Sequence, residues 1–380
     1  MISITKRIAK NVLIKPASVL FNKRLDLDSN TAYGRLEQYS PCSNGKCYTT
    51  HKVNIQYDLQ IIIPAYNVEK YIRECLTSVI AQKTQYTVFV TIVNDGSTDQ
   101  TKHIIETFLN ENLIANSQNT DTFETASGTM VFQLITQPNK GLSGARNTAL
   151  DTICGEYVMF VDSDDLLPAN AIESMLDMAK KAQADIVQGG WTEFSVNTVY
   201  EYSMPKSGII EFSDELLSGF AWGKIYRWNV LQHFDFPQGF WFEDTPVSFI
   251  LYAMPFRFAA VKESVYKYRR NPQGITLTAP KQKRAVDSFW ITKRCLEEFP
   301  EFGLNYNQRA YEYLLRQIVT NGKRTKFQPK AIRESIFILS RDLLDQYFTG
   351  FNTKNKRLKP LENAIRNQQF SKYVIILLSL

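Results

Sequence analysis

The chain has 380 residues, 44% of them apolar and 22% charged, so it can form two or three domains and has an ordinary globular composition. This composition excludes a disordered, collagen-like or disulfide-stapled chain. The net charge of +6 is unevenly spread: residues 1–57 carry +6, residues 58–280 carry −10 and residues 281–380 carry +10. An acidic centre suits a metal site and basic ends suit an anionic membrane surface, although solvated helix faces explain the basic ends equally well.

Cysteine usage and hydropathy bear on location. Only Cys42 and Cys47 of the five cysteines are close in sequence, and no second Cys/His pair completes a zinc site, which favours a reducing cytoplasm. Residues 2–21 could form a basic amphipathic helix, but no secretory signal core follows the basic start. The longest apolar run, residues 373–380, is far shorter than the roughly 20 residues that span a bilayer. We expect a cytoplasmic protein, with peripheral contact at the inner face of the cell membrane left open.

From residue 59 onward, strand and helix patterns alternate. Residues 59–64 form a buried-type strand ended by proline, and Asn67 can cap a helix whose apolar face includes Ile72, Cys75 and Val79. Residues 115–129 are polar and aperiodic, which is typical of a surface insertion. The further strands are expected at residues 87–93, 131–136, 157–161 and 184–191, and Pro168 opens a helix that runs to residue 181. Such alternation predicts an α/β fold with a mostly parallel sheet covered by helices on both faces.

The domain organisation follows from these patterns. Residues 1–57 form a basic N-terminal extension to which we assign no chemistry, and residues 58–275 form the α/β domain. Beyond it, residues 281–299, 307–323 and 329–347 read as helices rich in Arg, Lys and aromatic residues. We therefore expect a basic helical C-terminal region over residues 276–380.

The most informative stretch is the acidic end of the strand at residues 157–161. Asp162, Ser163, Asp164 and Asp165 follow it directly, and three carboxylates in four positions repel one another unless a cation or hydrogen-bond donors compensate. Ligands bind at the carboxyl ends of strands in α/β sheets. The pattern therefore predicts a divalent-metal and phosphate site.

Four motifs occur in one order along the chain: Ile63-Pro-Ala-Tyr-Asn67, Val93-Asn-Asp-Gly-Ser-Thr-Asp99, Asn139-Lys-Gly-Leu-Ser-Gly-Ala-Arg-Asn147 and Asp162-Ser-Asp-Asp165. Together they resemble the family-2 nucleotide-sugar glycosyltransferases with the GT-A fold, of the type that builds bacterial surface polysaccharides and glycoconjugates. A lone D-x-D motif is nearly uninformative, but four motifs in order at strand ends are specific.

The resemblance implies roles on the donor side. Pro64, Ala65, Tyr66 and Asn67 would line the uracil pocket, and Asp95 would accept a hydrogen bond from the uracil N–H. The alternatives are that Asn67 only caps its helix and that Asp95 is a turn aspartate before Gly96.

The third and fourth motifs would handle the diphosphate. Gly141 and Ser143 would let the backbone approach phosphate at a helix N-terminus, and Arg146 would add a cation or bond the nucleoside. The alternative for Arg146 is a salt bridge to the acidic strand end. By resemblance, Asp162 faces the ribose together with Ser163, and Asp164 binds Mn²⁺ or Mg²⁺ through the donor diphosphate. Asp165 is left open between a ligand and a helix cap.

The segment Gly239-Phe-Trp-Phe-Glu-Asp-Thr-Pro-Val247 resembles the family's E-D pair. There Asp244, with Glu243 beside it, would act as general base in an inverting transfer, and the rings of residues 240–242 would raise its pKa and offer a face to a sugar. The alternative is that Asp244 or Thr245 caps a helix that has Pro246 in its first turn.

Two further segments bear on the site. Trp222 and Lys224, in a segment that also resembles the family, would shape the acceptor side, although core packing explains Trp222 equally well. Some GT-A enzymes use a downstream histidine as an additional metal ligand, but residues 265–276 contain none, so Arg269 or Arg270 would supply positive charge instead.

The sequence thus predicts a metal-dependent, inverting hexosyltransferase that moves a sugar from a UDP-sugar to a hydroxyl of a glycan, glycolipid or glycoprotein. The donor and acceptor are its expected partners, and no nucleic acid is. One alternative is a non-catalytic GT-A-like subunit of another transferase, and a second is a nucleotidyltransferase. The transferred sugar, the acceptor and the oligomeric state are not readable from the sequence.

Overall fold

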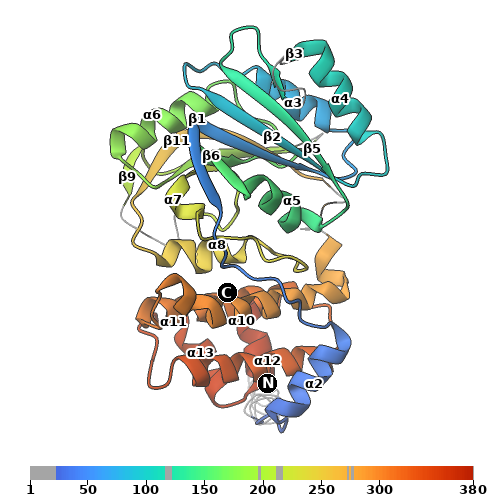
Figure 1. Ribbon diagram of the computed structural model, residues 1–380. Coiled ribbons are helices and arrows are strands. Elements are labelled where there is room, and N and C mark those ends of the chain that lie inside the picture. The colour runs from blue at the N-terminus through green and yellow to red at the C-terminus, as the bar shows by residue number, and fades with distance from the viewer. Residues whose placement is uncertain are drawn as a thin grey trace, which may run out of the picture. The chain divides into compact units, whose positions relative to one another are not determined.

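The computed structural model describes residues 23–115, 122–195, 198–210, 217–271, 274 and 278–379. The helix expected over residues 2–21 lies outside this range. The chain divides into two compact units, one within residues 44–274 and one that joins residues up to 43 with residues from 275 onward. Figure 1 shows the sheet of the first unit and the helices of the second.

The first unit is built on one mixed sheet of eleven strands in the described part of the chain, with β8 paired to β7 beside the order β3-β4-β5-β2-β1-β6-β10-β7-β11-β9. The centre β5-β2-β1-β6 is parallel, as is the pair β7-β11, while β10 runs antiparallel between β6 and β7. The inner strands are β1 Lys52–Ala65, β2 Val88–Asp95, β5 Met130–Gln137, β6 Thr152–Phe160, β7 Ile186–Phe194, β10 Lys224–Arg227 and β11 Phe258–Arg269. The outer strands are β3 Ile114–Ala115, β4 Thr122–Glu124, β8 Val199–Tyr202 and β9 Gly208–Ile210. The GT-A prediction of a parallel sheet thus describes the centre, and antiparallel pairs extend it.

Helices cover both faces of this sheet (Figure 1). Alternate residues of β1, namely Leu59, Ile61 and Ile63, join a buried cluster with α3 Ile72–Ile80, α4 Thr101–Asn112 and α6 Ala171–Ala182. The intervening Gln60 faces α5 Gly141–Leu150, where its amide donates to the Ala149 carbonyl over 3.1 Å. The period of two along the strand therefore assigns one face to each helix layer. Two short helices, α7 Trp228–Leu231 and α8 Thr245–Phe249, complete the unit.

Several boundaries differ from the sequence prediction, among them the following. The strand β1 starts earlier than residue 59 and continues through Pro64, because a proline costs only one ladder hydrogen bond and the register with β2 runs on to Ala65. The helix expected to open at Pro168 begins at Ala171, since Pro168 forms the preceding turn and its carbonyl accepts from Gln82 over 2.7 Å. Part of the expected insertion at residues 115–129 is strand β4, which pairs with β5.

The second unit is helical and contains α2 Ser29–Tyr39, α10 Asp287–Glu298, α11 Gln308–Arg324, α12 Lys330–Tyr347, α13 Lys359–Arg366 and α14 Phe370–Ser379. Asp28 caps α2 by accepting from the Thr31 N–H over 2.9 Å. The indole of Trp290 on α10 donates to the Ser40 carbonyl over 2.8 Å, so the segment after α2 is tied to the C-terminal helices. Within the described residues, no helix is both long and apolar enough to cross a bilayer.

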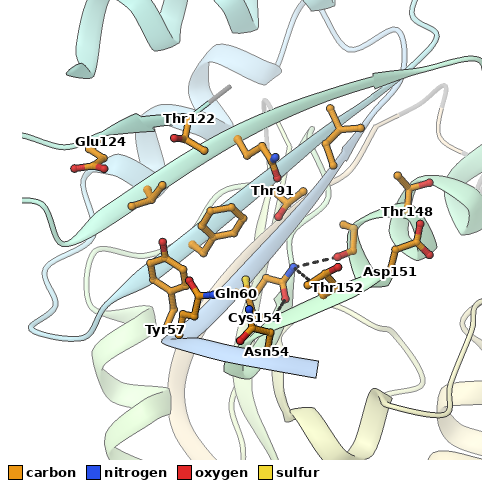
Figure 2. A pocket seen from close by; sticks show the side chains of 16 residues that line it. Asn54, Tyr57, Gln60, Thr91, Thr122, Glu124, Thr148, Asp151, Thr152 and Cys154 are labelled. Carbon is orange, nitrogen blue, oxygen red and sulfur yellow. Dashed lines mark hydrogen bonds between the residues drawn. The ribbon is translucent and has the colours of Figure 1, made fainter. Parts of the chain in front are cut away.

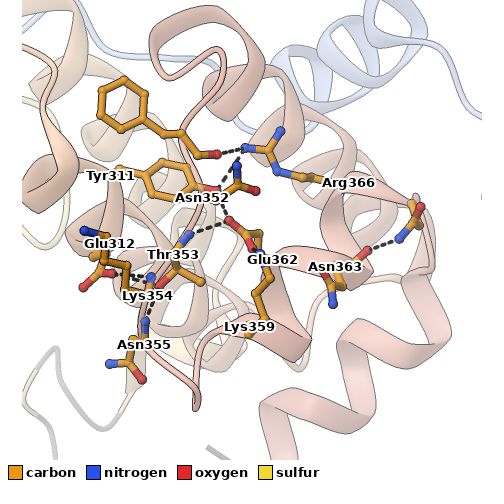
Figure 3. A network of polar contacts seen from close by, with 12 residues as sticks. Tyr311, Glu312, Asn352, Thr353, Lys354, Asn355, Lys359, Glu362, Asn363 and Arg366 are labelled. Atoms are coloured by element: carbon orange, nitrogen blue, oxygen red, sulfur yellow. Dashed lines mark hydrogen bonds and ion pairs between the residues drawn. The ribbon is translucent and has the colours of Figure 1, made fainter.

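A buried carboxylate organises the end of this helical unit (Figure 3). Glu362 on α13 is fully buried and accepts from the Tyr311 hydroxyl, from the Thr353 N–H over 2.8 Å and from Lys359. Burial alone would raise the pKa of Glu362, but the hydrogen bonds from Lys359 and Tyr311 outweigh it and lower the pKa. One carboxylate therefore joins α11, α13 and the intervening loop.

Candidate active site

The candidate site lies at the carboxyl edge of the parallel strands. In register, Ala65 at the end of β1 pairs with Asn94 near the end of β2, and Ile62 pairs with Phe160 at the end of β6. The motif residues that follow these strands therefore come to one edge, as the fold of parallel strands requires.

The first motif is locked to the second by side-chain hydrogen bonds. Asn67 has a left-handed backbone (φ 50°), which asparagine tolerates, and its Oδ1 accepts from the Thr98 N–H over 2.8 Å. Its own N–H donates to Ser97 Oγ over 3.1 Å. Asn67 does not cap α3, which begins five residues later at Ile72 without a side-chain cap, so that alternative was wrong. Pro64 and Ala65 are buried, whereas Tyr66 is 48% exposed.

Asp95 is buried at the end of β2 and ties this strand to the start of α5. Its Oδ1 accepts from the Gln137 amide over 2.7 Å and from the Lys140 N–H over 2.9 Å. Gly96 follows with φ 70°, and a Cβ there would lie 2.7 Å from the Asn139 nitrogen. The turn therefore requires glycine, and Asp95 serves the turn while its second carboxylate oxygen has no hydrogen bond assigned among the described residues.

One exposed and two buried residues of α5 bear on the site. Gly141 is exposed with φ 76°, so it adopts a conformation that favours glycine at the start of the helix. Ser143 is buried, and its hydroxyl donates to the Pro237 carbonyl over 3.0 Å. Asn147 exchanges two hydrogen bonds of 2.9 Å with the backbone of Phe236. These bonds attach the segment before the E-D pair to α5.

Arg146 is the centre of the site. Its guanidinium is 1% exposed and donates to Asp162 Oδ1 over 2.9 Å, to Glu243 Oε1 over 3.1 Å and to Asp244 Oδ1 over 2.9 Å. It also lies 4.9 Å from the ring centre of Phe236. Burial disfavours its charge, but the three carboxylates outweigh burial and raise the pKa of Arg146. The salt bridge to the acidic strand end, which the sequence left as an alternative, is therefore present and extends to the E-D pair.

The acidic strand end divides into residues with different surroundings. Asp162 faces Arg146, and Ser163 is buried. Asp164 Oδ2 accepts from the Asn271 amide over 3.2 Å, and burial together with the charge of Asp162 raises the pKa of Asp164. Arg269 donates through Nε to the Asp164 carbonyl over 2.7 Å, so the positive charge expected from this segment is close by.

Asp165 has a structural role. It is fully buried, where Oδ1 accepts from the Arg269 N–H over 2.6 Å and Oδ2 from the Tyr266 hydroxyl over 2.8 Å. Burial and the charges of Asp164 and Asp162 raise its pKa well above the ordinary range. The cap alternative for Asp165 was wrong, because α6 starts at Ala171 and Asp165 instead fastens the strand end to β11.

The E-D pair sits on a constrained turn before α8. Phe242 has φ 64°, which is rare for an aromatic residue and marks local backbone strain. Asp244 precedes Thr245 and Pro246 at the start of α8 but makes no side-chain cap, so its carboxylate is directed elsewhere, to Arg146. Burial and the charge of Asp244 raise the pKa of Glu243 to about 7, and burial raises the pKa of Asp244 despite Arg146. Asp244 keeps 23% of its side chain exposed, against 11% for Glu243.

The segment beside Asp244 holds the two residues expected on the acceptor side. Lys224 is fully buried, and Trp222 is 4% exposed and stacks on Tyr266 and Tyr268. Trp222 is therefore a packed residue, and the exposed ring is its neighbour Phe220, at 42%.

A separate hollow of about 510 Å³ lies on the sheet face beside α5 (Figure 2). Polar side chains such as Gln60 and Thr91 line it together with Tyr57 and Phe89. It contains none of the donor-site or E-D residues predicted from the motifs.

Metal ligation by several side chains finds no support among the residues that the structure describes. They contain no group of three or more His, Cys, Asp or Glu side chains placed to hold a metal ion. Asp164 Oδ1 has no hydrogen bond assigned there, and burial, followed by the charge of Asp162, raises the pKa of this carboxyl. This fits a divalent ion completed by ligands other than protein side chains.

The sequence reasoning missed Asn271 and Tyr266 as parts of this region. Tyr266 and Tyr268 alternate along β11, and this period of two is the one local signal that could have placed them on a common face. Nothing in the sequence around Asn271 indicates its contact with Asp164.

Comparison with known proteins identifies the family of the domain that contains the candidate site. Residues 60–226 match the model of the family described as glycosyl transferase family 2. These residues belong to glycosyl transferase family 2. The glycosyltransferase GlyA of Streptococcus pneumoniae is 30% identical over 230 residues, which are 56% of this chain but 30% of GlyA. The uncharacterized glycosyltransferase EpsJ of Bacillus subtilis is 26% identical over 317 residues, 76% of this chain and 85% of EpsJ.

Solved structures agree on the fold. Residues 1–349 of TarS from S. aureus, crystallised in complex with UDP-GlcNAc, match with a TM-score of 0.61 at 20% identity and cover 85% of this chain and 91% of that structure. At this identity the likeness establishes the fold, which is of the GT-A type. The predicted family and fold class are thus confirmed.

Proposed function

We propose that this chain is an inverting glycosyltransferase that moves one sugar from a UDP-sugar to a hydroxyl of a glycan, glycolipid or glycoprotein. The observation that carries the proposal is the Arg146 cluster, in which one buried cation contacts a carboxylate at the end of β6 and the acidic pair before α8. UDP-GlcNAc is the first donor to test, because TarS was crystallised with it.

On the donor side, the uracil would lie between Tyr66 and Asp95. The exposed Tyr66 ring can stack on the base, and the second oxygen of Asp95 can accept the uracil N–H. Pro64, Ala65 and Asn67 shape this pocket, and Asp162 with Ser163 faces the ribose. Gly141 at the start of α5, with Ser143 two residues further on, leaves the backbone open to the diphosphate.

Chemistry would take place at Asp244. Its carboxylate removes the acceptor hydroxyl proton while the hydroxyl oxygen attacks the anomeric carbon. The bond from that carbon to the diphosphate oxygen breaks, its electron pair leaves with UDP, and the configuration inverts. The raised pKa of Asp244 makes it a stronger base, and its partial exposure admits the acceptor. Glu243 is more buried, so we assign it the positioning of Arg146.

Asp164 would hold a divalent ion, Mn²⁺ or Mg²⁺, together with the diphosphate. Such an ion supplies positive charge to the leaving UDP. Asn271 orients the Asp164 carboxylate through Oδ2.

The test is Asp244→Asn, with Asp345→Asn on the exposed surface of α12 as the matched control. We expect Asp244→Asn to lower UDP-GlcNAc-dependent transfer by at least about 100-fold while UDP still raises the melting temperature. Asp345→Asn should retain wild-type activity. Full transfer by Asp244→Asn would remove the base assignment.

The two alternatives give different products. Release of pyrophosphate from UTP and a sugar 1-phosphate, without release of UDP from a UDP-sugar, would indicate a nucleotidyltransferase. No turnover of any UDP-sugar, with or without Mn²⁺, would favour a non-catalytic partner subunit. Contact with an anionic membrane stays a prediction from the basic ends, which sedimentation with anionic vesicles would check.

A further inference from the structure

The loop of residues 218–222, called the 218–222 loop below, is held by side chains at several of its backbone groups. The Ser218 carbonyl accepts from the Tyr252 hydroxyl over 2.7 Å, and the Ala221 carbonyl accepts from the Tyr226 hydroxyl over 3.0 Å. The Ser218 N–H donates to Gln188 over 2.9 Å. These bonds come from β7, β10 and the segment after α8, so the loop has one defined shape.

The side chain of Lys224 makes further hydrogen bonds to this loop. It is fully buried, and its Nζ donates to Ser218 Oγ and the Phe220 carbonyl, both over 2.7 Å, and to the Trp222 carbonyl over 3.5 Å. All three acceptors are neutral and lie in the 218–222 loop. A buried ammonium without a hydrogen-bonded carboxylate is costly, so its presence indicates that the shape of this loop matters for more than packing.

The 218–222 loop exposes the aromatic ring of Phe220. Phe220 is 42% exposed, and its ring stacks on Trp222 with centres 4.6 Å apart and planes 7° from parallel. Trp222 stacks in turn on Tyr266, with centres 4.6 Å apart and planes 12° from parallel. Phe220 has no other ring contact among the described residues, so the stack supports it from one side only.

The 218–222 loop also lies beside the segment of the proposed base. A Cβ added at Gly219 would lie 3.3 Å from the Ser248 hydroxyl oxygen on α8, the helix that begins directly after Asp244. The backbone of Ala221 is close enough to the Asp244 carboxylate to lower its pKa. Because consecutive Cα atoms are about 3.8 Å apart, Phe220 starts within one residue of the group that an acceptor hydroxyl must reach.

We infer that Phe220 is a binding platform for the acceptor, on which a pyranose ring stacks while its hydroxyl meets Asp244. The inference rests on the proposed function and names the class of acceptor: a glycan with a pyranose at its end, in contrast to a linear polyol phosphate. The C–H bonds of a pyranose face carry slight positive charge and complement the negative face of an aromatic ring. A linear polyol offers no such flat face.

The test compares Phe220→Ala, Phe220→Leu and Phe220→Tyr in the full chain, with Phe327→Ala as the matched control. Phe327 is 60% exposed and belongs to the helical unit. UDP release from UDP-GlcNAc is measured against methyl pyranosides of glucose, galactose and N-acetylglucosamine, and against ribitol 5-phosphate. Saturation-transfer NMR of the same methyl pyranosides with UDP-loaded protein gives a readout that does not need turnover.

We expect the KM for the preferred pyranoside to rise about 10-fold in Phe220→Ala, because the sugar loses its stacking contact with an aromatic ring. Phe220→Leu should resemble Phe220→Ala, because leucine is apolar but has no ring face, and Phe220→Tyr should resemble wild type. The KM for UDP-GlcNAc should not follow this order. Saturation transfer to the pyranose C–H protons should weaken in Phe220→Ala and persist in Phe327→Ala.

Three results would overturn the inference: wild-type protein that binds none of the methyl pyranosides, a Phe220→Leu variant equal to wild type, or better use of ribitol 5-phosphate than of every pyranoside. Failure of the proposed function looks different. In that case UDP-GlcNAc is not turned over by wild type, while the NMR comparison of Phe220→Ala with Phe327→Ala still decides whether the ring binds a pyranose.

Discussion

Replacement of Arg146 by methionine is the sharpest test of the site's electrostatics. Methionine keeps most of the apolar chain but removes a cation that contacts Asp162, Glu243 and Asp244 over 2.9–3.1 Å. Removal of one partner from a buried ion pair costs about 3–5 kcal/mol, and here three carboxylates lose their partner together. Since they can protonate instead of staying charged, we expect a loss within that range at pH 8 rather than a threefold larger one.

The free energy of unfolding of Arg146→Met should depend on pH in a defined direction. Burial already raises the pKa values of Glu243 and Asp244 in the folded state, and without Arg146 they rise further above their unfolded values. The folded state then binds more protons than the unfolded state, so the free energy of unfolding of the variant increases as the pH falls from 8 to 5. The difference from wild type should therefore shrink towards pH 5.

The assay is urea unfolding followed by tryptophan fluorescence, because four of the five tryptophans lie in the unit of residues 44–274. The matched control is Arg227→Met, which removes a half-exposed pair with Glu156 at 3.6 Å and should cost at most about 1 kcal/mol. Addition of Glu243→Gln to Arg146→Met should restore part of the loss. Equal losses for Arg146→Met and Arg227→Met, or a loss that is constant from pH 8 to 5, would refute the reasoning.

Two buried groups give further predictions about pH. Burial lowers the pKa of Lys224 from 10.5 to about 7, so a charged Lys224 lowers the free energy of unfolding by about 5 kcal/mol below pH 7. Between pH 7 and 10 the folded state has lost this proton while the unfolded state keeps it, so the free energy of unfolding of wild type should increase with pH. Lys224→Met should lack that increase. Because the variant loses the costly charge together with its hydrogen bonds, its free energy of unfolding at pH 7 should lie within about 2 kcal/mol of the wild-type value. A steeper pH dependence in the variant would contradict this. Hydrogen bonds lower the pKa of Glu362, so its contribution is present above pH 4.5 and is lost as the pH falls through the folded-state value. Glu362→Gln should therefore cost about 1–3 kcal/mol at pH 7 and less at pH 3, as measured by amide hydrogen exchange in α11, and an equal cost at both pH values would argue against it.

Much of the fold could be predicted because its signals are local. The mostly apolar run at residues 59–63 is buried on both faces in β1, and helix α3 buries Ile72, Cys75 and Val79 as their spacing predicts. Motif residues that end neighbouring parallel strands meet because parallel strands share one carboxyl edge. The bounds of β1 and α6 were less predictable, because a register or a tertiary hydrogen bond decides them.

The contacts of the acids were not predictable, since their partners are distant in sequence. Asp165 looks like Asp164 in the sequence, yet β11 removes it from the edge through Tyr266 and the Arg269 backbone, about 100 residues away. The same strand end supplies Asn271 to Asp164, where the sequence analysis had looked for a histidine. Periodicity contains no information about which of two adjacent carboxylates a later strand will fasten.

The Arg146 cluster also changes how the two halves of the proposed reaction relate. The sequence assigned the acidic strand end to the donor and Asp244 to the acceptor as separate sites, but one guanidinium donates to both Asp162 and Asp244. When Asp244 takes a proton, Arg146 loses one of its negative partners and its charge acts more strongly on Asp162 and the nucleoside beside it. Proton transfer on the acceptor side would then strengthen positive charge near the donor as UDP becomes more negative. Asp162→Asn should therefore shift the acidic limb of the pH–rate profile, which a donor contact isolated from Asp244 would leave in place.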